Sequence, residues 1–108
     1  MTIANRMTVV FVLAAALAAV ACEAAECRMN VEDLCSEICA CTDSYECVVV
    51  EGYVYTHFDD FALCVDYFEA DICGTGIDSE QCAEAAMSAQ CIEDEEGRAL
   101  ALPAECRD

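Results

Sequence analysis

The chain of 108 residues has no lysine and no tryptophan, and it has only one proline and one histidine, His57. Without lysine, Schiff-base chemistry is excluded, and a single histidine excludes most general-base schemes. His57 stands near Asp59 and Asp60, but we expect it to be a partly exposed residue on an aromatic strand. We therefore predict no catalytic residue and a protein that is not an enzyme.

Several cofactor and metal motifs are also missing. No Cys-x-x-Cys pair occurs, which argues against a thioredoxin-type redox site, and neither a haem attachment motif nor a Gly-rich phosphate loop is present. The acidic run Glu93–Glu96 precedes Gly97, yet an EF-hand aligned on that glycine would place Ile92 and Pro103 at ligand positions. We predict no cofactor and no metal site, and keep calcium or metal binding as an alternative.

Positive charge is scarce. The chain has 22 acidic residues and four basic ones, with a formal net charge of −18. All the acidic residues follow Cys22, where only Arg28, Arg98 and Arg107 oppose them. So negative a surface repels phosphate backbones and anionic lipid headgroups, which argues against nucleic acid as a partner. We expect an unknown protein partner, and contact with a membrane only through a covalent lipid on Cys22.

An uncharged run from Met7 to Ala21 follows Arg6. It is shorter than the about 20 apolar residues that a membrane span requires. A basic residue, a short apolar run and small residues at its end are typical of a secretory signal peptide. We predict a signal peptide over residues 1–21 and a single acidic, cysteine-rich, extracytoplasmic domain over residues 22–108.

The junction Ala19-Val20-Ala21-Cys22 resembles the lipobox of bacterial lipoproteins. The resemblance implies that Cys22 is diacylated and becomes the new N-terminus. Ala19 departs from the motif, because leucine is most usual at its position. The same residues also fit the Ala-x-Ala rule for ordinary cleavage. The expectation is a lipid-anchored protein, with plain secretion as the alternative.

Cysteine is abundant, with 11 residues. An odd thiol in an exported protein requires an explanation, and lipidation of Cys22 leaves an even set that can form five bridges. So high a cysteine content in a short secreted chain predicts a disulfide scaffold whose bridges dominate stability. The predicted disulfide cysteines are Cys27, Cys35, Cys39, Cys41, Cys47, Cys64, Cys73, Cys82, Cys91 and Cys106.

The pairing of these ten cysteines is left open. Five precede the segment Val48–Phe58 and five follow it, so an odd number of bridges must connect the two halves. The regular spacing of Cys64, Cys73, Cys82 and Cys91 suggests a helical hairpin closed by Cys64–Cys91 and Cys73–Cys82. That pairing requires Cys73 and Cys91 to lie beyond their helices. Nine residues of an α-helix turn through about 900°, which would place the two cysteines of one unbroken helix on opposite sides.

The patterns predict a mainly α, small disulfide-rich fold with three short helices and a possible short β-hairpin. The first helix is expected to begin at an N-cap, Asn30, and to end near Ala40. Its apolar stripe has helical spacing. The stripe comprises Val31, Leu34, Cys35, Ile38 and Cys39.

The segment Val48–Phe58 is rich in β-branched and aromatic residues around Glu51-Gly52, which favours a hairpin, with a helix as the alternative. In a strand, Tyr53, Tyr55 and His57 share one face, opposite Val54, Thr56 and Phe58. We predict Tyr53, Tyr55 and His57 as the contact patch for a partner.

Two further helices are expected in the second half. Asp59 or Asp60 caps a helix that ends before Gly74, and Asp78 with Gln81 opens another that continues through Gln90. The run Glu93–Glu96 is then expected to be a loop. Two functions remain: a structural or protein-binding module, or alternatively a secreted inhibitor or effector that presents this loop to a basic partner.

Overall fold

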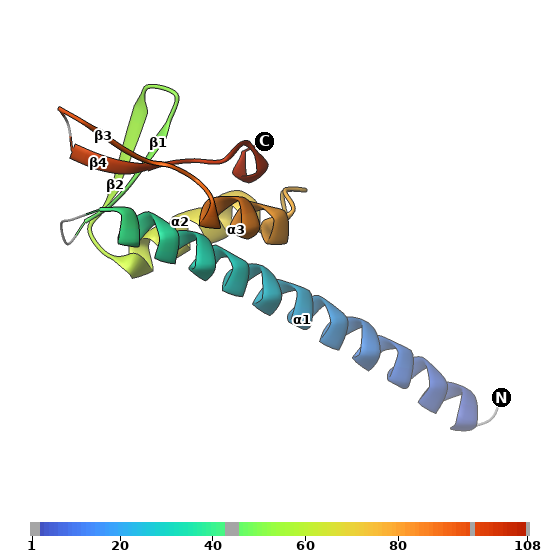
Figure 1. Ribbon diagram of the computed structural model, residues 1–108. Helices are drawn as coiled ribbons and strands as arrows, with labels where there is room; N and C mark the ends of the chain where they lie inside the picture. Colours follow the sequence, from blue (N-terminus) through green and yellow to red (C-terminus); the bar gives the residue numbers. More distant parts are fainter. Residues whose placement is uncertain (1–2, 43–45, 96, 108) are drawn as a thin grey trace.

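A computed structural model describes residues 3–42, 46–95 and 97–107, with side chains described from Cys22 onward. Within these ranges, three α-helices alternate with the two pairs of strands of one four-stranded sheet, and a 3-10 turn comes last (Figure 1). Their bounds are α1 Ile3–Cys41, β1 Cys47–Glu51, β2 Val54–Phe58, α2 Phe61–Ile72, α3 Ser79–Met87, β3 Cys91–Asp94, β4 Gly97–Ala101 and η1 Ala104–Cys106. The predicted mainly helical, disulfide-rich class is confirmed, but the sheet is larger than a short hairpin.

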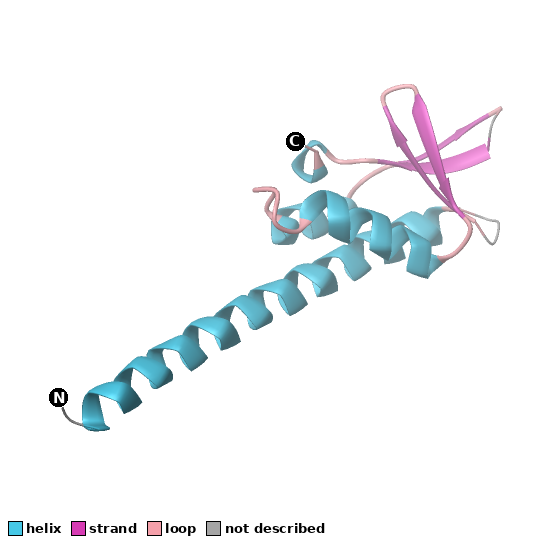
Figure 2. Cartoon of the chain, turned by 180° about the vertical axis from the view of Figure 1, so that it is seen from behind, coloured by secondary structure: helices cyan, strands magenta, loops and turns pink. Residues whose placement is uncertain are grey.

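The sheet has the order β2-β1-β4-β3, and it lies at one end of the helical layer (Figure 2). The β1–β2 and β3–β4 pairs are antiparallel hairpins, and β1 and β4 join them in parallel. The predicted hairpin within residues 48–58 is therefore confirmed. The predicted helix through Gln90 is wrong, because α3 ends at Met87. The predicted loop at Glu93–Glu96 is wrong at Glu93 and Asp94, which pair with β4 as part of strand β3, whereas Glu95 lies in a turn and Glu96 lies outside the described residues.

Helix α1 keeps the predicted apolar stripe but not the predicted start. Val31, Leu34 and Ile38 are buried in the main core. Asn30 lies inside the helix, and its Nδ2 donates a hydrogen bond to Ser79 Oγ at 3.0 Å. Alanine, glutamate, arginine and methionine just upstream are strong helix formers, so the helix continues through the position where a cap was expected. The expectation of a short first helix is wrong for the same reason.

The predicted caps of the other two helices are confirmed. Asp60 accepts a hydrogen bond from the backbone nitrogen of Leu63 at 2.9 Å and begins α2. Asp78 accepts one from Gln81 at 3.1 Å and begins α3. Each carboxylate satisfies an otherwise unpaired amide in the first turn, where the helix dipole also favours negative charge.

The main core lies between the helices and one face of the sheet, called here the inner face. Phe68 from α2 and Leu100 from β4 are almost completely buried in it. Phe58, Tyr67 and Phe68 form an aromatic cluster whose ring centroids lie 5.0 to 5.8 Å apart. Burial of these apolar side chains is the main non-covalent source of stability.

Five disulfides surround this core, and the predicted disulfide scaffold is confirmed. Three bridges connect residues before the β1–β2 hairpin with residues after it, which agrees with the odd number expected. The suggested Cys64–Cys91 and Cys73–Cys82 ladder is wrong, because α1 supplies the partner of three of these cysteines. The pairs are Cys27–Cys73, Cys35–Cys64, Cys39–Cys47, Cys41–Cys91 and Cys82–Cys106.

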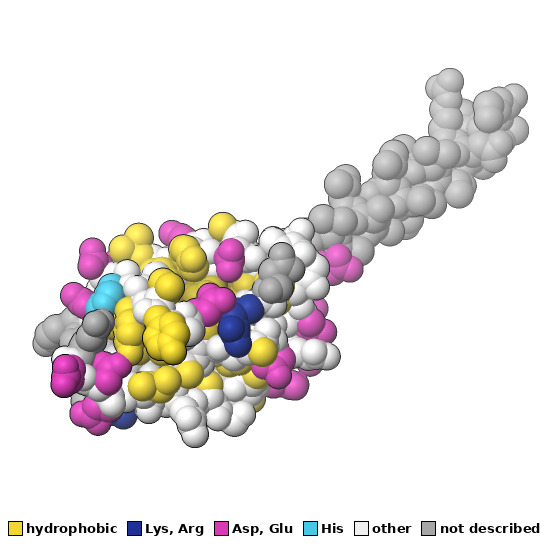
Figure 3. Space-filling model, turned by 90° about the horizontal axis from the view of Figure 1, so that it is seen from above, with side chains coloured by type: hydrophobic (Ala, Val, Ile, Leu, Met, Phe, Trp, Pro, Cys, Tyr) yellow, Lys and Arg dark blue, Asp and Glu magenta, His cyan; other side chains and the backbone are white. Residues whose placement is uncertain are grey.

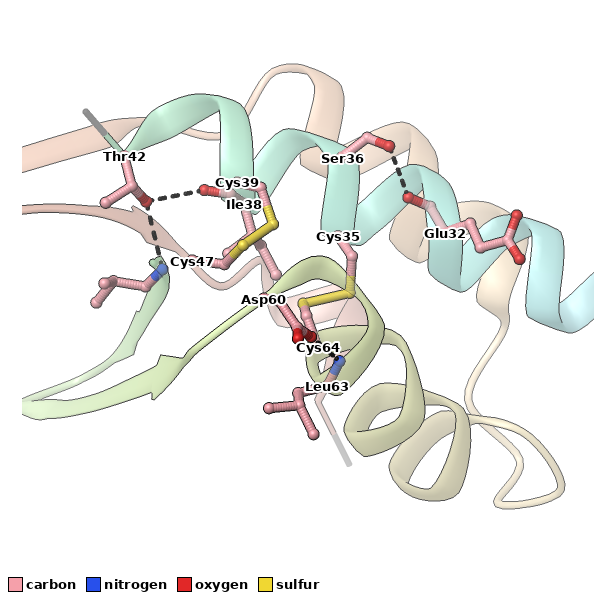
Figure 4. Close-up of a disulfide and its surroundings, with 11 residues drawn as sticks. Glu32, Cys35, Ser36, Ile38, Cys39, Thr42, Cys47, Asp60, Leu63 and Cys64 are labelled. Carbon is pink, nitrogen blue, oxygen red and sulfur yellow. Dashed lines mark hydrogen bonds between the residues drawn. A yellow bond between two sulfur atoms is a disulfide. The ribbon is translucent and has the colours of Figure 1, made fainter. Parts of the chain in front are cut away.

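The end of α1 is fastened to the sheet and to α2 by neighbouring bridges (Figure 4). Cys35 is bonded to Cys64, one helical turn before the Cys39–Cys47 bridge to β1. Thr42 Oγ1 donates to the carbonyl of Ile38 at 3.2 Å and accepts from the β1 backbone at 3.3 Å. The last turn of α1 therefore sets where β1 begins.

In the described part of the chain, no helix has both the length and the apolar character that crossing a bilayer requires.

Candidate binding surface

The β1–β2 hairpin presents an aromatic side chain at its tip. Glu51 pairs with Val54, which leaves Gly52 and Tyr53 as a two-residue turn. Gly52 has a φ of +63°, as the first central position of a type II′ turn requires. The Tyr53 side chain is 99% exposed. It therefore contributes little to folding and is available to a partner.

Tyr55 is placed differently, because its ring lies across the outer face of the sheet. It packs against a small cluster formed by Val48, Val50 and Ala99. Its hydroxyl donates a hydrogen bond to the carboxylate of Asp94, on the opposite edge strand. The tyrosine thus covers apolar residues that would otherwise face water, and connects the two hairpins.

His57 lies on the same face as Tyr55, as the alternation of a strand predicts. Its side chain is exposed, and Nδ1 is 3.3 Å from Oε2 of Glu46. Tyr53 does not share this face, because it belongs to the turn. The three residues are thus neighbours along one hairpin but in three environments, and their role in binding stays a prediction.

A surface groove lies on the other side of the hairpin, and the sequence patterns did not predict it. Along the inner face of β2, the exposed fraction of the side chains falls from 66% at Val54 to 6% at Phe58, since α2 covers only one end of the strand. The uncovered end forms a groove of about 110 Å³, called here the β2–α2 groove. It is lined by Val49, Glu51, Val54, Thr56, Tyr67, Phe68, Asp71 and Leu102.

The groove combines an apolar floor with an acidic rim. Val49 and Phe68 are buried beneath it, and Leu102 is fixed by a hydrogen bond from its amide to the Val50 carbonyl at 2.9 Å. Glu51 and Asp71 supply carboxylates at the rim. On the face drawn in Figure 3, acidic side chains surround apolar ones and basic side chains are few.

The described residues contain no group of three or more His, Cys, Asp or Glu side chains arranged to hold a metal ion. The acidic run that was considered for calcium begins in β3, where Glu93 and Asp94 are exposed. Glu96 lies outside the described residues. Absence of catalytic, cofactor and metal sites stays a prediction.

Cys22 is the one cysteine of the chain that forms no disulfide among the residues described, and its side chain is exposed. It precedes the first bridged position, Cys27, by five residues of α1.

No protein-family model, curated protein or solved structure matches the chain. What it can bind must therefore be inferred from its own side chains.

Proposed function

We propose that this chain is an exported, non-enzymatic protein-binding module that a lipid on Cys22 anchors to the cell envelope. The supporting observation is the distribution of cysteines: ten are paired in five disulfides around the core, and Cys22 is exposed and unpaired among the described residues. Disulfides of this density persist in oxidising compartments. The structure is that of a small disulfide-rich protein of extracellular type.

The anchor follows from charge and from the lipobox-like junction. With a formal net charge of −18, the chain is repelled by anionic lipid. Two acyl chains hold a protein stably at a membrane where one does so only marginally, and a diacylated Cys22 supplies two. The signal peptide over residues 1–21 would deliver Cys22 to the lipid-transferring enzymes.

Expression of the full chain in an exporting bacterial host tests this anchor. We expect the wild-type protein in the membrane fraction, with a mass increased by a diacylglyceryl group on Cys22. The Cys22→Ser variant should move to the soluble fraction, while Ser36→Ala, a matched exposed control on α1, should not. Wild-type protein in the soluble fraction with an unmodified Cys22 would exclude the anchor.

Protein binding is assigned to the β1–β2 hairpin because its tip is exposed and aromatic. Because the Tyr53 side chain does not pack against the core, Tyr53→Ala should change the free energy of unfolding by less than about 0.5 kcal/mol. An effect of this variant on binding can then be assigned to the lost contact. We expect the variant to weaken partner binding by a similar factor at low and at high salt, because removal of an aromatic contact changes no charge. Binding that is unaffected at Tyr53 would instead favour a secreted effector that binds through the acidic run Glu93–Glu96.

A further inference from the structure

We propose that the β2–α2 groove binds one aliphatic side chain of a cationic partner protein, with a lysine or arginine next to that side chain contacting the groove's carboxylates. This inference rests on the proposed protein-binding function and names the chemistry of the partner. It is carried by the size of the groove, the burial of its floor and the charges at its rim.

The volume of the groove selects the ligand. At about 110 Å³ it is well below the roughly 300 to 1,000 Å³ of small-molecule sites. A cavity of about 150 Å³ accommodates benzene, so a single leucine, isoleucine or valine side chain suits the groove. Val54 and Tyr67 form walls that are 66% and 50% exposed. An inserted side chain would bury both and gain apolar contact.

The negative charge at the rim of the groove favours a basic residue next to the inserted side chain of the partner. Asp71 lies in the last turn of α2, where the helix dipole disfavours a negative charge. Its neighbour Glu69 accepts a hydrogen bond from Arg28, whereas the carboxylate of Asp71 has no hydrogen-bond or ion-pair partner among the described residues. A carboxylate whose charge is unfavourably placed, and which no cation of the same protein neutralises, is typical of a functional surface. A cation from the partner would neutralise it.

Glu51, at the end of strand β1, also lines the groove and is only partly neutralised. The nearest arginine nitrogen, Nη1 of Arg107, is 3.9 Å from its Oε1, and both side chains are substantially exposed. So long a surface ion pair contributes little. Glu51 therefore remains able to attract a second positive charge on the partner.

These charges argue against a second copy of the chain as the occupant. Each copy carries a formal net charge of −18 and no lysine, so two copies repel one another. A basic partner is attracted by the same field, which also raises its rate of encounter. The structure thus favours a cationic protein segment over self-association.

The test is a nuclear magnetic resonance titration of the oxidised, ¹⁵N-labelled full chain with three peptides. The first contains Leu-Arg-Arg flanked by glycines, the second replaces leucine by serine, and the third replaces both arginines by glutamate. We expect weak binding of the first peptide, with shifts concentrated at Val54, Thr56, Tyr67 and Asp71. The seryl and glutamyl peptides should each bind at least about tenfold more weakly, which corresponds to about 1.4 kcal/mol.

Variants locate the site. Thr56→Leu should fill the groove and abolish the preference for leucine over serine, and Val54→Thr is a milder second variant that should weaken binding about threefold. Asp71→Asn should weaken binding about threefold at low salt while leaving the melting temperature unchanged or slightly higher. Asp66→Asn removes a charge from the same helix outside the groove and should have little effect.

Equal binding of the leucyl and seryl peptides would overturn the inference, because it would indicate charge adsorption alone. Shifts confined to the outer face around His57 would also overturn it. A dimer in sedimentation that Thr56→Leu dissociates would make a second copy the occupant. Each of these results leaves unaffected both the weakening of partner binding by Tyr53→Ala and the membrane fractionation of Cys22→Ser, so failure of the groove is distinguishable from failure of the proposed function.

Discussion

Cys22 and Cys27 lie five residues apart on the same helix, yet they belong to different parts of the molecule. Cys27 is bonded to Cys73 at the end of α2, and from that point onward α1 packs against the rest of the fold. Cys22 is exposed and lies before the first bridge. The part of the chain that the disulfides connect, called here the fastened unit, therefore begins at Cys27. Cys22 lies outside it and can be chemically modified without disturbing the fold.

Reduction of all five disulfides should have the largest effect on the stability of the part of the chain after Cys27. Each bridge contributes about 2–4 kcal/mol, not additively, against a typical total stability of about 5–15 kcal/mol. We expect the region after Cys27 to unfold completely in excess dithiothreitol, measured as loss of the helical signal in far-ultraviolet circular dichroism. The oxidised Cys22→Ser variant is the control and should keep the native spectrum. A native spectrum after full reduction would show that the core alone suffices.

Truncation of a core side chain should come next. Phe68 is 2% exposed and contacts the rings of Phe58 and Tyr67, so Phe68→Ala should lower the free energy of unfolding by about 3–5 kcal/mol. Met29, on the exposed side of α1, is the matched control, and Met29→Ala should change it by less than about 0.5 kcal/mol. Urea unfolding of the oxidised proteins measures both. Similar effects would contradict the assigned core.

Removal of the first bridge should have a smaller and local effect. The double variant Cys27→Ser and Cys73→Ser retains the other four bridges, so we expect a loss of about 2 kcal/mol, at the lower end for a disulfide. Because Cys35 is the next fastened position of α1, amide exchange should accelerate mainly between residues 27 and 34. Uniform acceleration across the sheet would instead mean that this bridge supports the whole fold.

Replacement of Cys22 should have the smallest effect on stability. Cys22→Ser changes an exposed side chain outside the fastened unit, so the free energy of unfolding should stay within about 0.5 kcal/mol. Thermal unfolding of the detergent-solubilised wild type and of the variant compares them. A loss of more than about 1 kcal/mol would mean that Cys22 takes part in the fold.

The features that were predictable from the sequence are governed by neighbours along the chain. Asp60 and Asp78 cap helices through hydrogen bonds to residues three positions later, and the β-branched run around Gly52 forms a hairpin by pairing with itself. Such interactions depend on local residue order, which the sequence displays directly. The apolar stripe of α1 follows from helical spacing for the same reason.

The features that were missed depend on residues distant in sequence. Strand β3 forms because Ile92 pairs opposite Ala99 and because Cys91 is bonded to Cys41, so Glu93 and Asp94 lie in a strand where a loop was expected. The β2–α2 groove depends on how far α2 extends beneath β2, which no local pattern encodes. Exposure of Val54 was therefore not predictable from its alternation with Tyr55.

The intact mass of the unreduced protein, recovered from the membranes of an exporting host and followed by thiol counting, tests most directly whether this is a lipid-anchored, disulfide-stapled module. We predict a chain that begins at Cys22, carries a diacylglyceryl group and has no free thiol. An unmodified chain with one free thiol would contradict the anchor, and many free thiols would contradict the disulfide scaffold.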